Sequence, residues 1–251
     1  MKIEITSRTN PRLKELLAVK EKLFFFEGEK LVRDILTRKL LVQKLLVSAE
    51  GNDRLPEIAA VVEECWLVSS QVLEKVSDLK NSPQMVAVLD VPEGGIDFHR
   101  QKVTLGFVGI QDPGNLGTVF RCASAFGVSA LALAGACVRP NHPKVIRSAQ
   151  TAILDVPFQI FSSADELIDK ALAHDAHVYV TGSHQAETSL PLARLEFPCL
   201  LLFGNEGQGL APHLLGRFPL VRLEQKERID SLNVAVSACI LMHELKRIHG
   251  L

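Results

Sequence analysis

The chain has 251 residues, of which 47 % are hydrophobic and 23 % charged, a composition typical of a globular protein with a sizeable core and not of a disordered chain. The formal net charge is -1, so any contact with nucleic acid must come from local basic patches. Met1–Thr6 lacks the apolar core of a signal peptide, and no run of about 18 or more apolar residues suggests a membrane span. We therefore expect a cytoplasmic protein.

The first ninety residues alternate amphipathic and short apolar runs, with Asn10 as a plausible cap and Pro11 at the first position of the first helix. The expected helices span Asn10–Glu21, Glu27–Lys39, Leu55–Glu64 and Ser70–Leu79, and the expected strands span Leu23–Phe26, Leu41–Ser48, Cys65–Val68 and Met85–Val91. This pattern predicts a small α/β domain over residues 1–92. The turn-forming stretch Pro92–Asp97 indicates a linker at residues 93–99.

The second half contains short runs rich in Val, Leu and Ala, separated by helical segments. These runs are Val103–Val108, Ala130–Ala134, His177–Val180, Cys199–Phe203 and Leu220–Leu223. They predict strands buried on both faces of a largely parallel sheet, so that residues 100–251 form a second α/β domain. The closing segment Leu232–Ile248 predicts a helix that is apolar almost all round, either central in the core or shared with a second subunit.

The five cysteines form an odd set without CxxC spacing. They are Cys65, Cys122, Cys137, Cys199 and Cys239. Each lies among apolar residues, so we expect free buried thiols in a reducing compartment and neither disulfides nor a metal site. His174 and His177 are also spaced poorly for a metal site.

A first motif, Asp112–Arg121, follows the strand that ends near Val108. Asn115 and Leu116 stand where a phosphate loop needs Lys and Ser or Thr, which argues against nucleotide triphosphate chemistry. The remaining pattern is a Gly/Pro turn and a helix that begins around residues 116–118, whose unpaired backbone N–H groups suit an anion. Taken alone, Arg121 is better explained as a side chain that extends to solvent or pairs with a carboxylate.

A second motif, Phe203–Leu210, places three glycines directly after an apolar strand. Their order is G-x-x-G-x-G, the reverse of the dinucleotide fingerprint, so a nicotinamide site is disfavoured. Close glycines indicate a tight turn or a close approach to a ligand. Asn205 and Glu206 between them favour a site, because open α/β sheets bind ligands at the carboxyl ends of their strands.

A third motif, Ser231–Val236, precedes the final helix. Ser231 and Asn233, like the preceding Asp230, are good capping residues. Capping explains one of the three polar residues and leaves the others open to a functional role.

The order and spacing of the three motifs resemble those of the SpoU (TrmH) family, which transfers a methyl group from S-adenosylmethionine to a ribose 2′-hydroxyl of RNA. Residues 100–251 resemble its catalytic domain. Residues 1–92, with Ser7–Lys14 and Phe26–Val32, resemble the ribosomal-protein-like RNA substrate-binding domain that precedes it in many members. The resemblance implies a SPOUT-type, largely parallel α/β sheet with a C-terminal trefoil knot. It also implies ribosomal RNA in preference to transfer RNA as substrate, and the proposed chemistry needs no metal. From the apolar surface of the final helix we expect a homodimer formed through the catalytic domain.

Residue by residue, the resemblance assigns a catalytic set and a set that binds the methyl donor. The catalytic set is Asn115, Arg121, Glu206, Ser231 and Asn233, and the donor-binding set is Thr181, Gly204, Leu223 and Leu232. The chain departs from the family pattern at Glu224–Lys226, in the donor loop, and at Arg147–Ala152, where the family tends to have a Ser and a Gly.

The side chain of Arg121 is a poor proton acceptor, because a guanidinium has a pKa above about 12. We therefore expect Arg121 to hold an RNA phosphate and so lower the pKa of the 2′-hydroxyl. Two other classes of protein remain open: an RNA-binding protein without activity on the same fold, which the intact polar set disfavours, and a nucleotide-dependent oxidoreductase, which lacks its glycine fingerprint.

Overall fold

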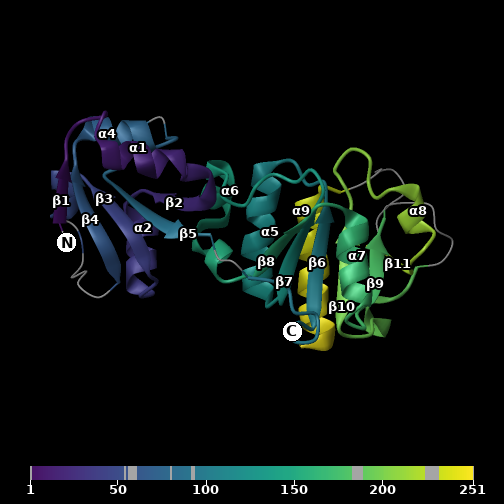
Figure 1. The fold of residues 1–251 in the computed structure, drawn as a ribbon. Helices are drawn as coiled ribbons and strands as arrows, with labels where there is room; N and C mark the ends of the chain where they lie inside the picture. The colour runs from purple at the N-terminus through teal and green to yellow at the C-terminus, as the bar shows by residue number, and fades with distance from the viewer. Residues whose placement is uncertain are drawn as a thin grey trace. The chain divides into compact units, whose positions relative to one another are not determined.

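The computed structural model describes residues 2–53, 55, 61–79, 81–91, 94–182, 189–223 and 232–250. The chain divides into two compact units, Met1–Pro92 with Asn141–Thr151, and Glu93–Pro140 with Ala152–Leu251 (Figure 1). The short segment Asn141–Thr151 therefore groups with the N-terminal unit, although it lies within the second half of the sequence.

The first unit is built on a mixed five-stranded sheet with the order β1-β4-β3-β5-β2. Its strands are β1 (Lys2–Ile5), β2 (Leu23–Glu27), β3 (Val42–Val47), β4 (Val62–Val68) and β5 (Met85–Asp90). Its helices are α1 (Pro11–Ala18), α2 (Glu29–Thr37), α3 (Ala49–Asn52), α4 (Ser70–Val76), α6 (Pro143–Ala149) and a 3₁₀ turn at Lys20–Lys22. Strands β1, β4 and β3 run parallel, and β5 is antiparallel to both of its neighbours.

The start of α1 confirms the predicted cap. The side chain of Asn10 accepts a hydrogen bond from the backbone N–H of Arg12 at 3.0 Å, and Pro11 opens the helix. Leu13 and Leu16 then fall on the buried face of the helix. This cap satisfies one of the N–H groups that a helix start leaves without a partner.

The predicted helix Leu55–Glu64 is wrong at its C-terminal end, because Val62 to Glu64 begin strand β4. Residues 56–60 lie outside the described part of the chain. Strand β4 pairs with β1 on one edge and with β3 on the other. The hydrogen bonds along both edges stabilise the strand conformation of these residues more than their short helical sequence pattern favours a helix. The four-residue strand β1 was not predicted; it lies at the edge of the sheet and pairs with β4.

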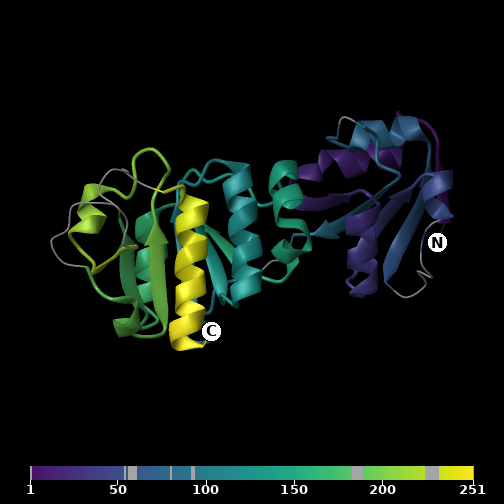
Figure 2. The ribbon, with the colours of Figure 1, turned by 180° about the vertical axis from the view of Figure 1, so that it is seen from behind.

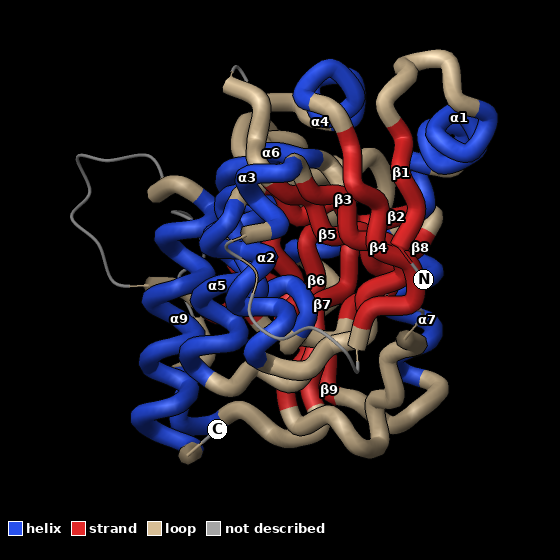
Figure 3. The backbone as a smooth tube through the Cα atoms, turned by 90° about the vertical axis from the view of Figure 1, so that its left-hand side faces the viewer, coloured by secondary structure: helices blue, strands red, loops and turns tan. Residues whose placement is uncertain are grey.

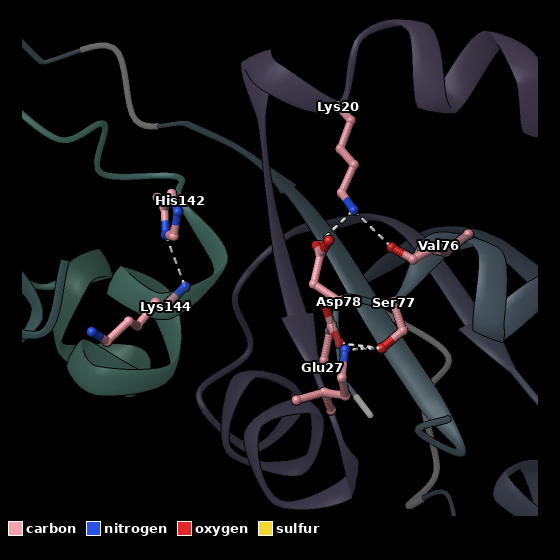
Figure 4. A network of polar contacts seen from close by, with 8 residues as sticks. Lys20, Glu27, Val76, Ser77, Asp78, His142 and Lys144 are labelled. Atoms are coloured by element: carbon pink, nitrogen blue, oxygen red, sulfur yellow. Dashed lines mark hydrogen bonds and ion pairs between the residues drawn. The ribbon is translucent and has the colours of Figure 1, made fainter. Parts of the chain in front are cut away.

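A polar network ties the end of α4 to neighbouring elements of the first unit (Figure 4). Lys20 donates to the carboxylate of Asp78 at 2.7 Å and to the carbonyl oxygen of Val76 at 2.8 Å. Glu27, which is 9 % exposed, accepts from the Ser77 hydroxyl and from the backbone N–H of Asp78. A carboxylate that is this buried needs such donors to offset its lost hydration.

The second unit is built on a six-stranded, wholly parallel sheet with the order β11-β9-β10-β6-β7-β8. Its strands are β6 (Val103–Val108), β7 (Ala130–Ala134), β8 (Phe158–Phe161), β9 (His177–Thr181), β10 (Cys199–Phe203) and β11 (Leu220–Val221). Its helices are α5 (Pro113–Phe126), α7 (Ala164–Leu172), α8 (Pro212–Leu215) and α9 (Val234–His249), with a 3₁₀ turn at Leu192–Arg194. A further 3₁₀ turn, Gln150–Leu154, crosses the boundary between the two units at Thr151.

Helices cover both faces of this sheet. Helices α5 and α9 pack side by side on one face, and α7 lies on the other (Figures 2 and 3). Strands β7 and β10 are therefore buried at every residue, which confirms the prediction of two covered faces. The trefoil knot stays a prediction, since residues 183–188 and 224–231 of the C-terminal part are outside the described residues.

Cys122 on α5 and Cys239 on α9 form a disulfide, so the prediction of free thiols is wrong for this pair. The two helices are neighbours in space, and their packing brings the two Cα atoms to 5.6 Å although 117 residues separate them. Cys65, Cys137 and Cys199 take part in no disulfide. Burial raises the pKa of the Cys199 thiol to about 12, and it also raises the pKa of Cys137.

Candidate active site

A cavity of about 450 Å³ opens at the carboxyl ends of strands β9, β10 and β11 and beside the start of α9. This is the edge of the sheet at which open α/β folds bind ligands. The four residues predicted to bind the methyl donor, Thr181, Gly204, Leu223 and Leu232, all line this cavity. They reach the cavity from four separate segments of the sequence.

The glycine loop after β10 forms part of the cavity wall. Asn205 and Gly209 exchange backbone hydrogen bonds of 3.2 and 2.9 Å, which closes a tight loop. A Cβ atom on Gly204 would lie 2.1 Å from the carbonyl carbon of Gly209 and 2.3 Å from the nitrogen of Leu210. No other residue type fits at Gly204 without moving the loop.

One chain of hydrogen bonds joins the three sequence motifs at the cavity. The side-chain amide of Asn115 donates to Oε1 of Glu206 at 2.9 Å, and the amide of Asn233 donates to Oδ1 of Asn115 at 3.0 Å. Glu206 and Asn233 are exposed, and Asn115 is half-buried. The three side chains thus form an ordered polar edge that a solvent-borne substrate can reach.

Two of these residues, Asn115 and Asn233, are positioned by the first turns of helices α5 and α9. Asp112 caps α5 by accepting from the backbone N–H of Asn115 at 2.9 Å, so the helix begins at Pro113, earlier than the predicted residues 116–118. Asn233 caps α9 through its Oδ1 atom, which accepts from the N–H groups of Ala235 and Val236. The amide group of Asn233 is left free to donate across to α5.

The structure places Arg121 outside the series of hydrogen bonds that joins Asn233, Asn115 and Glu206. Its side chain is exposed on α5, and it makes no hydrogen bond or ion pair within the described residues. Ser231 lies outside the described residues, and so does Glu224–Lys226, where the sequence departs from the family pattern. The other departure, Arg147–Ala152, forms the end of α6 and the following 3₁₀ turn.

The described residues hold no group of three or more His, Cys, Asp or Glu side chains that could bind a metal ion. Among the same residues, none of the helices is both long and apolar enough to cross a membrane.

The model of the SpoU rRNA methylase family matches residues 102–243, and that of the MRM3-like substrate-binding domain matches residues 10–87. The chain belongs to the SpoU rRNA methylase family. This membership confirms the predicted family, the RNA ribose 2′-O-methyltransferase activity and S-adenosylmethionine as the methyl donor. It also removes the oxidoreductase alternative.

Two curated relatives extend over most of the chain. The uncharacterized tRNA/rRNA methyltransferase slr1673 of Synechocystis is 31 % identical, over 97 % of this chain and 93 % of its own length. The 23S rRNA (guanosine(2553)-2'-O)-methyltransferase RlmP of Bacillus subtilis is 30 % identical, over 89 % of this chain and 88 % of its own length.

Two solved structures show the same fold over nearly the whole chain. The AdoMet-bound rRNA methyltransferase of Sinorhizobium meliloti superposes with a TM-score of 0.77 at 25 % identity, covering 98 % of each chain. A structure described as an RNA 2'-O ribose methyltransferase superposes with a TM-score of 0.73 at 29 % identity, covering 100 % of each chain. The predicted α/β fold with a parallel sheet is thereby confirmed.

The cavity fits S-adenosylmethionine. Its volume lies within the range of about 300–1,000 Å³ that small-molecule sites occupy. Its wall combines the apolar side chains of Leu223 and Leu232, the close backbone at Gly204 and the carboxylate of Glu206. S-adenosylmethionine carries a flat aromatic base and a positively charged sulfonium, and this wall offers an apolar surface for the base and a negative charge for the sulfonium.

The sequence analysis gave Asp112 no role and counted Asn205 as a sign of a site without giving it a function, although both residues shape the site. Asp112 carries a usable signal, since an Asp directly before a Pro at a strand-turn-helix junction is a helix-start signature. Asn205 binds the carbonyl oxygen of Gly109, 96 residues earlier, and no local pattern reveals that contact.

Proposed function

We propose that this protein methylates a ribose 2′-hydroxyl of ribosomal RNA of the large subunit. We propose further that the reaction depends on the hydrogen-bonded side chains of Asn233, Asn115 and Glu206 beside the cavity. RlmP and the 23S rRNA (uridine(2479)-2'-O)-methyltransferase of Streptomyces viridochromogenes support this substrate class. The second of these is 30 % identical over 66 % of this chain and 60 % of its own length. Their names give different nucleotides, so the target position is not transferred from either.

In the proposed mechanism, S-adenosylmethionine supplies an electrophilic methyl group on its sulfonium when bound in the cavity. The amide and carboxylate groups of Asn115 and Glu206 hold the ribose hydroxyl in line with that methyl group. Alignment of two reacting groups contributes much of the rate of such a transfer, and no metal is required for it. Asn233 fixes the orientation of Asn115 by donating to its Oδ1 atom.

Arg121 binds the RNA phosphate next to the reacting ribose in this proposal. Its exposed guanidinium makes no ion pair with the described residues, so it is available for an external anion. The positive charge of the guanidinium beside the hydroxyl lowers the pKa of that hydroxyl. As the methyl group is transferred, the proton passes to solvent water, which reaches this exposed edge. Ser231, next to Asn233 in the sequence, completes the proposed polar set.

We assign RNA recognition to residues 1–92 and catalysis to residues 100–251, joined by the linker at residues 93–99. The match of residues 10–87 to the MRM3-like substrate-binding domain supports this division. Arg8 and Arg33 form ion pairs inside the first unit, with Glu74 and Glu29 respectively. Basic side chains without such a partner, such as that of exposed Lys14, are better placed to contact phosphate.

We also infer a homodimer that forms through α9. Val236 and Ile240 lie one helical turn apart and are 47 % and 40 % exposed, while Val234, Leu241 and Leu245 are buried. Apolar side chains on an exposed helix face favour association. Light scattering at micromolar concentration should report twice the mass of one chain. A monomer at that concentration would rule out this inference.

The cytoplasm is the proposed site of action, since ribosomal RNA of the bacterial relatives is made and modified there.

The decisive experiment compares ribose methylation across total RNA from three strains: cells with the gene, cells without it, and cells without it that are complemented with an Arg121→Ala variant. One ribosomal ribose should lose its methyl group in the second and third strains. Loss confined to a transfer RNA would support the transfer RNA alternative, and no change anywhere would support an inactive RNA-binding protein.

A further inference from the structure

The side chain of Asn205 links the two loops that carry the first and second motifs. Its Nδ2 atom donates to the carbonyl oxygen of Gly109 at 2.8 Å, in the loop that leads from β6 to Asn115. Its Oδ1 atom accepts from the backbone N–H groups of Gly207 and Gln208 at 2.8 and 3.4 Å. One half-buried amide thus holds its own turn and, separately, binds the neighbouring loop.

Each partner of this link is itself fixed. Strands β6 and β10 are in register up to Phe107 and Phe203, whose rings stack at 5.0 Å, so the two loops leave the sheet side by side. Gly109 has a φ of +72° and donates from its backbone to Ala134 in β7 at 3.0 Å. A hydrogen bond between two anchored loops sets their separation more firmly than contacts between mobile side chains do.

We propose that Asn205 is a positioning residue for methyl transfer, because its amide sets the separation of Asn115 on one loop from Glu206 on the other. Glu206 directly follows Asn205 and accepts the hydrogen bond from Asn115 at 2.9 Å. A shift of the second loop would lengthen that bond and move the polar edge away from the reacting hydroxyl. This inference rests on the proposed roles of Asn115 and Glu206.

Two substitutions separate the link between loops from the turn. Asn205→Asp keeps an oxygen that can accept from Gly207 but replaces the donor to Gly109 with a second acceptor. Asn205→Ser keeps a short side-chain acceptor for the turn, is neutral, and cannot span to Gly109. An effect common to both variants therefore comes from the lost link and not from charge. Asn205→Ala removes both functions, and Gln111→Ala, an exposed position on the loop of Gly109, is the control.

The assay uses the full chain, radiolabelled S-adenosylmethionine and RNA extracted from cells that lack the gene, with donor affinity measured by calorimetry and folding by thermal unfolding. We expect the Asp and Ser variants to lower kcat by roughly ten- to a hundredfold, the scale of a small misplacement of reacting groups. Their KM for RNA, donor affinity and midpoint of unfolding should match those of the wild type and of Gln111→Ala. Asn205→Ala should weaken donor binding as well.

Wild-type kcat in both the Asp and the Ser variant would overturn the positioning role. So would a fall in kcat matched by an equal loss of donor affinity in both, which would show that Asn205 only holds the turn. Asn115→Ala and Glu206→Gln are measured in the same assay. Full kcat in these two variants would overturn the proposed function of the polar chain, and the inference with it.

Discussion

Asn233 and Asn115 are 118 residues apart in the sequence and joined by a hydrogen bond of 3.0 Å between their side-chain amides. The same Asn233 side chain caps α9 through its oxygen, so one amide both starts a helix and orients a residue on another helix. Helix stability and site geometry are therefore coupled at this position, and substitutions can separate them.

Asn233→Asp should preserve the cap and impair catalysis. A carboxylate still accepts from the first N–H groups of α9, but it cannot donate to Asn115. We expect kcat to fall by at least about tenfold with little loss of stability, whereas Asn233→Ala should also lower the free energy of unfolding by about 1 kcal/mol. Urea unfolding and single-turnover kinetics measure the two effects. Equal kcat in the Asp variant and the wild type would contradict the proposed link.

Gly204→Ala should weaken donor binding, while Gly207→Ala should not do so to a comparable degree. A Cβ atom at Gly204 would lie 2.1 Å from the backbone of Gly209, so the loop must move. At Gly207 the nearest heavy atom would be the Oδ1 atom of Asn205 at 3.5 Å, an ordinary contact. Calorimetry with S-adenosylmethionine checks this pair of variants. Similar donor affinities for the two would show that the loop is not part of the donor site.

Arg121→Ala should abolish methyl transfer while donor affinity and stability remain close to those of the wild type. The side chain is exposed and makes no ion pair within the described residues, so its removal leaves no buried partner unsatisfied. Arg121→Lys, which keeps the charge but not the two-pronged geometry, should recover only part of the activity. Turnover on RNA from cells without the gene provides the measurement. Substantial turnover by the Ala variant would remove Arg121 from the mechanism.

The sequence predicted the central strands best, because a strand buried on both faces is a continuous apolar run. Strands β6, β7 and β10 have the predicted bounds. The start of β4 was missed because pairing on two edges, which is not local, decided its conformation. The N-terminal cap at Asn10 was predicted because a cap depends only on the residues next to it.

In the site, too, the features that depend on neighbouring residues could be predicted, and the contacts between distant segments could not. Residue types and spacing marked the three motifs, and the family resemblance indicated that they meet. Their contacts depend on the order of β6 and β10 in the sheet, which the sequence does not state. The bond from Asn205 to Gly109 and the disulfide from Cys122 to Cys239 both join distant segments through packing, so neither was predicted.

Reduction of the Cys122–Cys239 disulfide should destabilise the second unit. The bond closes a loop of 117 residues between α5 and α9, and such a link restricts the unfolded chain. We expect reductant, or the double substitution Cys122→Ser with Cys239→Ser, to lower the free energy of unfolding by about 2–4 kcal/mol. Cys65→Ser should retain the response to reductant. Alkylation of all five cysteines after unfolding in urea without reductant would contradict the presence of the bond.

The buried thiol of Cys199 should make stability depend on alkaline pH. Burial in β10 raises its pKa from 9.0 to about 12, so the folded protein keeps the proton after the unfolded chain has lost it. Since this pKa is raised on folding, its contribution to stability is complete below about pH 9 and declines as the pH rises toward 12. The decline should approach roughly 1.4 kcal/mol per pH unit in that window. Urea unfolding of the wild type and of Cys199→Ala, compared at about pH 8 and about pH 10, isolates this group. Parallel pH dependence in the two proteins would show that the Cys199 thiol loses its proton as readily in the folded state as in the unfolded one.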